Sequence, residues 1–246
     1  MKTHLLGDSG VAFGSIAPEI PRIERSGVPL PPAAATSLSP QGWPSRGYRP
    51  SFEPVGNVQS LTFRLADAVP MKQIERWERE LGLGMLRAAN PADTEATWSR
   101  CELQKRIERW EDSGQGECWL RNPEIAAVVD NALRFFDGVR YRLLGWCIMP
   151  NHVHVVLEFL PGFAVPEVLH SWKTVTTREA NRRLGRTGAL WSEDHFEGYL
   201  RTTEHFQRVL DSVADNPVKA GLVLRRDLWR WSHAGNRDVP TVLRPR

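Results

Sequence analysis

Residues 146–158 read WCIMPNHVHVVLE and combine a turn signal with a run of alternating side chains. Side chains in a β-strand point alternately to opposite faces of the sheet. In a strand over 152–159, His152 and His154 therefore share one face, while Val153 lies on the face that can pack against a helix. Two imidazoles at i and i+2 are close enough to bind one metal ion, although a lone His-x-His pair is a weak signal.

Hydrophobic periodicity predicts the elements on either side of this strand. A second strand is expected over about 139–148, joined to the first by a turn at 149–151, and a half-buried strand is expected at 60–65. Helices are expected over about 71–86, 96–110, 122–136, 165–184 and 202–214, the last one stopped by Asn216-Pro217. This order predicts an α+β sandwich in which helices pack on an antiparallel sheet.

The composition sets limits on the class of protein. The 246 residues carry a net charge of +3 and are 41% hydrophobic, which suits one globular domain with some additional length. The mild basic excess allows a polyanionic partner without requiring one. Three cysteines without a CxxC pair disfavour a thiolate zinc site and favour reduced thiols in the cytoplasm. We expect neither a signal peptide nor a membrane span, because no long apolar run occurs.

The chain divides by composition into a tail and a domain. Residues 1–57 hold nine of the 18 prolines and few clustered large apolar side chains. Such a segment buries too little surface to offset the entropy lost on ordering. We therefore expect a disordered tail over 1–57, one domain over 58–233, and a short C-terminal tail over 234–246.

Four further motifs accompany the histidine motif, and together the five point to a known family. They read LTFRLAD (61–67), GECWL (116–120), MPNHVH (149–154), NRRLGRTGALW (181–191) and DNPVKAGLV (215–223). In this order they resemble the REP-associated tyrosine transposases and the related insertion-sequence single-strand transposases, the histidine–hydrophobic–histidine (HUH) class. The resemblance covers about residues 58–233 and leaves the proline-rich tail unmatched.

The resemblance implies a fold, a cofactor and a reaction. The fold is a ferredoxin-like α+β domain, and one divalent ion, Mg²⁺ or Mn²⁺, lies on His152 and His154. A tyrosine on the following helix attacks single-stranded or hairpin DNA and forms a covalent 5′-phosphotyrosine, and a homodimer is compatible with the family. The metal polarises the scissile phosphate. Because imidazole favours transition metals, Mg²⁺ or Mn²⁺ needs an additional oxygen ligand.

The expected nucleophile is missing from the helix that should carry it. Residues 165–181 read VPEVLHSWKTVTTREAN, with Val175 at the position that corresponds best to the tyrosine, or Thr176 if the register is shifted by one residue. Of the three tyrosines, Tyr48 lies in the tail and Tyr141 in the strand before the histidine motif. Tyr199 is therefore the candidate nucleophile. The alternative is that Tyr199 is an ordinary amphipathic surface residue and that the protein has lost cleavage.

The same helix supplies the other candidate site residues. Glu179 continues its apolar stripe, where a carboxylate is costly unless it is paired, hydrated or bound to a metal. It is therefore a candidate third ligand, and the alternative is a solvated glutamate paired with a nearby arginine. The candidate contacts to DNA phosphates are the basic residues of this helix and the next turn, namely Lys173, Arg178, Arg182, Arg183 and Arg186.

Three functions are compatible with these residues. The first is an active transposase that nicks and rejoins single-stranded DNA with a metal and a tyrosine, and the intact histidine pair favours it, because a pure binding module has no need of two adjacent imidazoles. The second is a DNA-binding relative that keeps the fold but lacks the nucleophile, and the missing helix tyrosine favours it. The third is a metal-dependent phosphodiesterase that uses activated water, which only the histidine pair supports.

Overall fold

The computed structural model describes residues 58–83 and 94–235. The expected tail over 1–57, and the expected C-terminal tail from residue 236 onward, lie outside the described residues. Within the described ranges, no helix has both the length and the apolar character needed to cross a membrane.

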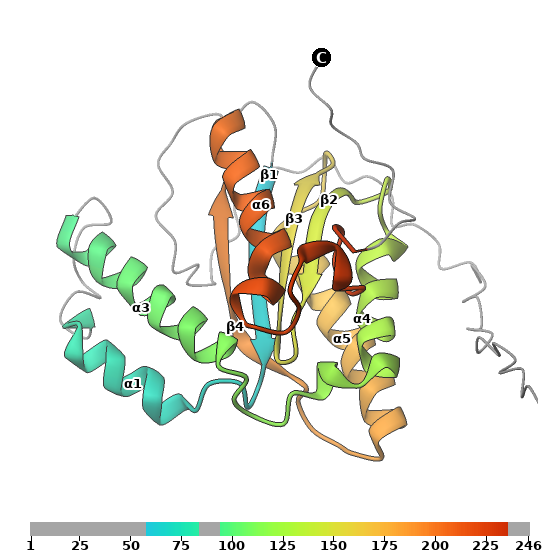
Figure 1. Cartoon of the computed structure of the whole chain (residues 1–246), viewed down its shortest axis with the longest axis horizontal. Helices are drawn as coiled ribbons and strands as arrows, with labels where there is room; N and C mark the ends of the chain where they lie inside the picture. Colours follow the sequence, from blue (N-terminus) through green and yellow to red (C-terminus); the bar gives the residue numbers. More distant parts are fainter. Residues whose placement is uncertain (1–57, 84–93, 236–246) are drawn as a thin grey trace, which may run out of the picture. The chain divides into compact units, whose positions relative to one another are not determined.

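Four antiparallel strands form a single sheet (Figure 1). They are β1 (Val58–Leu65), β2 (Tyr141–Ile148), β3 (His152–Phe159) and β4 (Trp191–Tyr199), in the spatial order β2-β3-β1-β4. Helical segments separate β1 from β2, and one helix separates β3 from β4. This strand–helix–strand–strand–helix–strand order is that of the ferredoxin-like fold, so the predicted fold class is confirmed.

Helices lie on both faces of the sheet and beside it. The helical elements are α1 (Met71–Glu80), α3 (Thr94–Asp112), η1 (Trp119–Arg121), α4 (Pro123–Phe135), α5 (Val165–Leu184), α6 (Thr203–Lys219) and η2 (Arg226–Leu228). On one face, Phe63 of β1 packs against Trp172 of α5, with ring centroids 6.1 Å apart. On the other face, Val213 of α6 belongs to a separate apolar cluster with Val156 of β3.

The histidine pair lies on the face that α6 covers. His154 is paired with Thr62 on β1 and with Cys147 on β2, and Cys147 belongs to the α6 cluster. The neighbouring Phe63 points to the opposite face, because adjacent residues of a strand alternate. Helix α5 is therefore separated from the histidines by the sheet (Figure 1).

Local signals explain where the structure agrees with the predicted elements. The predicted and observed bounds of β3 coincide, as do those of α5, which ends at Gly185 with a φ of 62°. A left-handed residue at this position is a common way to end a helix. Asn122 caps α4 as predicted, since its side chain accepts a hydrogen bond from the amide of Glu124.

Two elements differ from the prediction. Strand β4 was not predicted, because at the edge of the sheet it pairs only with β1 and keeps charged side chains such as Glu193 and Asp194 partly in solvent. Helix α6 continues to Lys219, although we expected it to stop before Pro217. Pro217 lies in the final turn, where its missing N–H removes one hydrogen bond, and the amide of Ala220 still bonds to the carbonyl of Asn216.

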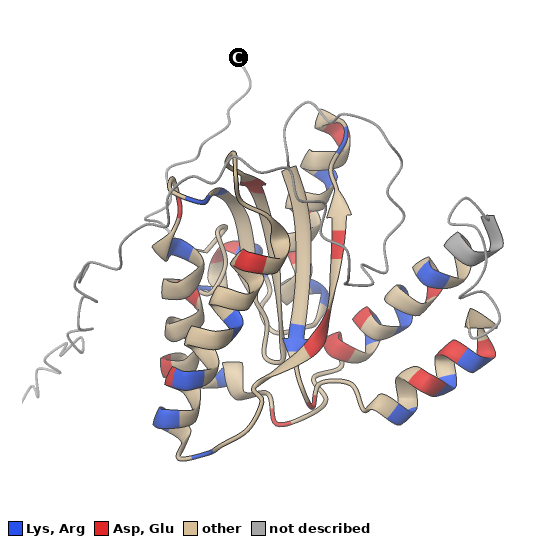
Figure 2. Ribbon diagram, turned by 180° about the vertical axis from the view of Figure 1, so that it is seen from behind, with Lys and Arg blue, Asp and Glu red and all other residues tan. Residues whose placement is uncertain are grey.

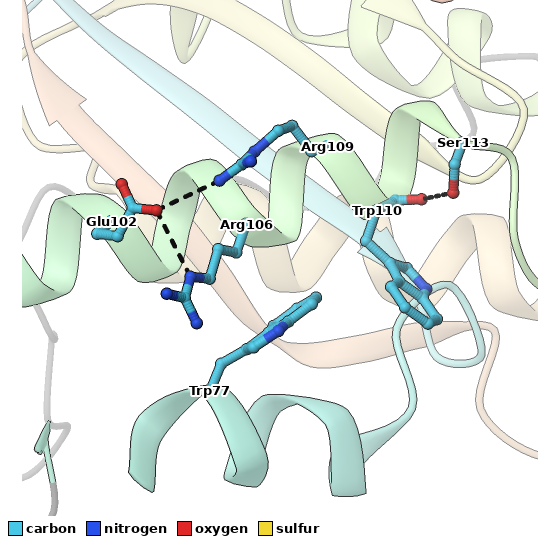
Figure 3. A pocket seen from close by; sticks show the side chains of 6 residues that line it. All are labelled: Trp77, Glu102, Arg106, Arg109, Trp110 and Ser113. Carbon is cyan, nitrogen blue, oxygen red and sulfur yellow. Dashed lines mark hydrogen bonds and ion pairs between the residues drawn. The ribbon is translucent and has the colours of Figure 1, made fainter. Parts of the chain in front are cut away.

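Helices α1 and α3 follow β1 and precede α4 in the sequence, and they pack against each other. They contact each other through Trp77 and Trp110, whose rings meet edge to face at 5.7 Å between centroids. A shallow pocket beside these rings is also lined by Glu102, Arg106, Arg109 and Ser113 (Figure 3). Helix α3 ends at Asp112, next to the histidine pair.

The buried hydroxyl of Tyr141 links three elements and allows a test of the core. It donates to the carbonyl of Leu133 at 2.7 Å and accepts from the indole nitrogen of Trp172 at 3.0 Å. Tyr141→Phe should lower the free energy of unfolding by about 1–3 kcal/mol, because both partners stay buried without a bond. Tyr199→Phe, whose hydroxyl has no partner in the described part of the chain, should cost less than about 0.5 kcal/mol. Equal effects in urea denaturation would contradict this account.

Candidate metal centre

The centre begins with two imidazoles on β3. The Nε2 atoms of His152 and His154 are 2.9 Å apart, and the two rings are close to perpendicular, at 87°. His152 is fully buried and His154 is partly buried. Residues i and i+2 of a strand point to the same face of the sheet, and here both rings meet at one point on that face.

Asn151 determines which nitrogen of His152 carries the proton. Its amide nitrogen donates to the backbone carbonyls of Glu111, at 3.0 Å, and Gln115, at 2.9 Å. The amide oxygen of Asn151 therefore faces Nδ1 of His152, at 2.8 Å. Because an amide oxygen can only accept, Nδ1 of His152 holds the proton and its Nε2 presents a lone pair.

Thr62 performs the matching role for His154 but allows two protonation patterns. Its Oγ1 lies 2.9 Å from Nδ1 of His154, and a hydroxyl can either donate or accept. When Thr62 donates, Nε2 of His154 can carry a proton and bond to His152. When Thr62 accepts, the Nε2 lone pairs of both histidines point to the same place, as two ligands of one cation would.

The distance and the charge state of the pair both fit a cation. Two ligand atoms at a right angle, each about 2.1 Å from an octahedral ion, are about 3.0 Å apart, close to the observed 2.9 Å. Burial, and then the neighbouring His154, hold the pKa of His152 well below its usual range. Burial, and then the charge of Lys219, lower the pKa of His154 to about 4. Both imidazoles are therefore neutral near pH 7, the form that binds metals.

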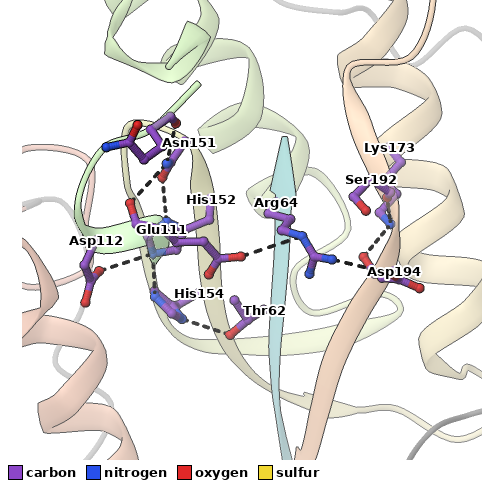
Figure 4. Close-up of polar contacts among 11 residues, drawn as sticks. Thr62, Arg64, Glu111, Asp112, Asn151, His152, His154, Lys173, Ser192 and Asp194 are labelled. Atoms are coloured by element: carbon purple, nitrogen blue, oxygen red, sulfur yellow. Dashed lines mark hydrogen bonds and ion pairs between the residues drawn. The ribbon is translucent and has the colours of Figure 1, made fainter. Parts of the chain in front are cut away.

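Helix α3 brings two carboxyl groups to the same face (Figure 4). Asp112 Oδ1 lies 3.8 Å from Nε2 of His152, and burial raises the pKa of Asp112 to about 6. Glu111 is buried, and neither of its oxygens has a hydrogen-bond partner among the described residues. Burial raises the pKa of Glu111 to about 8, although the charge of Arg64 opposes the shift.

These residues fit a divalent ion without forming a complete site as they stand. No group of three or more His, Cys, Asp or Glu side chains within residues 58–83 and 94–235 is arranged to hold a metal. Two convergent lone pairs and a buried carboxylate without a donor nevertheless form the environment that a cation would satisfy. The sequence analysis missed Glu111 and Asp112. Their signal is two adjacent acids in the last turn of a helix, where the dipole disfavours negative charge.

Arg64 extends the charged network across the sheet. It lies opposite His152 on the neighbouring strand and is almost fully buried. Its guanidinium is 3.8 Å from a carboxylate oxygen of Glu111 and 3.4 Å from one of Asp194 on β4 (Figure 4). The positive charge of Arg64 is therefore held beside the histidine pair. The Arg64 side chain is buried and does not reach solvent.

The structure does not bring Glu179 to the histidines. Glu179 lies on α5, which packs on the opposite face of the sheet. Its Oε2 accepts a hydrogen bond from Arg182 at 3.0 Å. This is the alternative given in the sequence analysis, in which the glutamate pairs with a nearby arginine.

The predicted basic residues are likewise on or just after α5 and already have partners. Lys173 donates to the backbone carbonyl of Ser192 at 2.7 Å, and burial lowers its pKa to about 8. Arg186 donates to the carbonyl of Ala189. The other three approach carboxylates of Glu179 or Glu124, and they are Arg178, Arg182 and Arg183. The sheet separates all five from the histidine pair.

Tyr199 also lies away from the pair. On β4, Phe196 is opposite Thr62 and Tyr199 is opposite Gln59, three residues or about 10 Å further along the strand and on the other face. Tyr141 lies on that other face as well, and burial raises its pKa to about 12. Helix α6, which covers the histidine face, contains no tyrosine. Tyr48 is outside the described residues.

Two solved structures are similar to the chain at low identity. A REP-associated tyrosine transposase bound to a REP hairpin matches with 14% identity and a TM-score of 0.43, over 81% of this chain and 92% of that one. A protein of Deinococcus radiodurans R1, described as an unconfirmed transposase, matches with 13% identity and a TM-score of 0.30, over 68% and 94%. At these TM-scores neither structure defines the fold, which rests on the strand order described above.

The family comparison concerns the segment that holds the histidine pair. No curated protein matches the chain. Residues 125–206, from α4 to the start of α6, match the family model described as "Transposase IS200 like". The similarity to IS200-like transposases therefore covers this segment, which includes β2, β3 and α5.

Proposed function

We propose that this transposase relative binds single-stranded or hairpin DNA beside a divalent cation, Mg²⁺ or Mn²⁺, held by His152 and His154, and that it has lost the tyrosine nucleophile. The observation that carries the proposal is the position of the tyrosines. Neither tyrosine in the described part of the chain lies on the histidine face of the sheet, and the helix that covers this face has none.

The residues around the pair would orient the ligands and attract DNA. Asn151 and Thr62 fix the ring orientations through Nδ1, as the outer partners of metal-bound histidines commonly do. A bound cation supplies positive charge that polarises a DNA phosphate. Lys219 at the end of α6 is exposed and close enough to lower the pKa of His154. Its ammonium group is a candidate phosphate contact on this face.

Metal binding can be tested on the imidazoles themselves. We expect Mn²⁺ titrated calorimetrically into the full chain to bind at one ion per chain, because two neutral imidazoles converge there. The double variant His152→Ala/His154→Ala should lose this binding. His195→Ala is the matched control, since His195 lies opposite Phe63 and therefore on the other face of the sheet. Unchanged binding by the double variant would exclude the site.

Contacts to DNA phosphates can be assigned to one face of the sheet. Lys219→Gln should weaken single-strand binding and reduce the log–log salt slope by about 0.7, the loss of one phosphate contact. Arg182→Gln on α5 should leave the slope unchanged, because α5 is on the far face and Arg182 already pairs with Glu179. A lower slope in Arg182→Gln alone would move the DNA to the α5 face and contradict the proposal.

The absence of a nucleophile predicts binding without covalent capture. With Mn²⁺ and end-labelled hairpin DNA, the wild-type chain should shift the DNA on native gels and give no adduct on denaturing gels. An adduct that disappears in Tyr199→Phe would restore Tyr199 as the nucleophile. An adduct that disappears in Tyr48→Phe would place the nucleophile outside the described residues. Cleavage without an adduct would instead indicate a metal-dependent phosphodiesterase.

A further inference from the structure

We propose that Asp112, at the end of α3, is the third protein ligand of the cation, which makes the centre a site of two histidines and one carboxylate. This inference rests on the proposed cation site of His152 and His154. It assigns the oxygen ligand to α3, which lies outside the segment matched by the family model, residues 125–206.

The distances are compatible with one shared ion. Two atoms bound to the same ion, each about 2.1 Å from it, can be at most about 4.2 Å apart. Asp112 Oδ1 lies 3.8 Å from Nε2 of His152, and the two Nε2 atoms are 2.9 Å apart. Both separations fall below this limit, so His152 could share one ion with His154 and with Asp112, which would supply the carboxylate oxygen.

The carboxylate of Asp112 is free to turn toward the ion. Its side chain is 34% exposed, and it accepts no hydrogen bond from the described residues. An aspartate has only two side-chain torsions, so a small rotation is enough to bring an oxygen to a ligand position. Among the described residues no group of three such side chains is arranged to hold a metal, so ligation would require Asp112 to make this rotation.

Glu111 provides an independent indication that the end of α3 lacks a polar partner. Its side chain is 1% exposed, and neither oxygen has a hydrogen-bond partner among the described residues. The nearest cationic atom described is Nε of Arg64 at 3.8 Å, beyond hydrogen-bond distance. A buried carboxylate in this condition is costly. A neighbouring cation with its bound water molecules would supply both the charge and the donors.

The end of α3 is positioned by the same amide that orients the histidine. Asn151 donates to the carbonyl of Glu111 and accepts from Nδ1 of His152. The residue next to Glu111 is therefore kept beside the ring whose lone pair faces the ion. Two acids in the last turn oppose the helix dipole, and ligation of a cation gives a physical reason for that unfavourable placement.

The donor set indicates the class of ion. Two imidazole nitrogens with one carboxylate oxygen suit a first-row divalent ion such as Mn²⁺ better than Mg²⁺, which prefers oxygen ligands and retains its water. Mn²⁺ is therefore the appropriate probe for the test.

The test compares two neutralised acids on one helix. Mn²⁺ is titrated calorimetrically into the full-length wild type, Asp112→Asn and Glu108→Gln, with the fold of each checked by thermal melting. Asp112→Asn keeps the shape of the side chain but should raise the Kd by about tenfold or more, at least the effect of losing an outer partner. Glu108→Gln removes an equal charge one turn away and should change the Kd by less than about fivefold.

The outcomes separate this inference from the proposed function. Asp112→Glu retains a carboxylate and should recover part of the affinity lost in Asp112→Asn. If Asp112→Asn binds Mn²⁺ like Glu108→Gln, or if Asp112→Glu is no better than Asp112→Asn, then Asp112 is not a ligand, while the histidine site stands. If the wild type binds no Mn²⁺, or binds it equally without both histidines, the proposed cation site itself is overturned.

Discussion

The hydrogen bonds of the Asn151 amide hold the centre together. This side chain is fully buried, and its nitrogen donates to two carbonyls at the end of α3 and the following turn. With both donors used, the oxygen has only one orientation left, toward Nδ1 of His152. A flipped amide would place N–H against N–H and oxygen against oxygen inside the protein, at the cost of several buried unpaired groups. The protonation pattern of the histidine and the position of the two acids therefore depend on one amide.

The alternation of side chains along the strands is the second constraint, and it decides which residues can act together. Thr62 and His154 are neighbours on one face, and every residue one step away belongs to the other. Groups that reach the pair must come from the same face of the sheet, from α6, or from the end of α3. A helix on the opposite face is separated from the histidines by the sheet itself. The acidic and basic side chains of α5 lie on the side opposite the histidines. They cannot reach the histidine pair, although their chemistry would suit a metal ligand or a phosphate contact.

The sequence predicted those parts of the fold that local signals specify. The bounds of β3 and α5 and the cap at Asn122 follow from alternation, periodicity and a side-chain hydrogen bond. Strand β4 was missed because an edge strand carries charges that hide its alternation. The histidine pair could be proposed from its i, i+2 spacing together with the motifs that accompany it in the sequence. The carboxyl groups of Glu111 and Asp112 could not, because they reach it through a tertiary contact. The stripe that contains Glu179 shows which side of α5 is buried, but not which face of the sheet the helix covers.

Electrostatics connects the carboxyl groups to the proposed binding of DNA. Acidic and basic residues alternate along α1 and α3 (Figure 2), so this helix pair offers no broad positive surface for a phosphate backbone. At its end, ionised Asp112 would repel a phosphate that approached the histidines, whereas burial raises the pKa of Glu111 to about 8 and keeps it mostly neutral near pH 7. Arg64 is buried between two acids. A divalent ion bound beside the histidines would offset the charge of Asp112 and leave the charge of Lys219 uncompensated. In the proposed function, attraction of DNA to this face would therefore depend on the cation, even without a nucleophile to use it for cleavage.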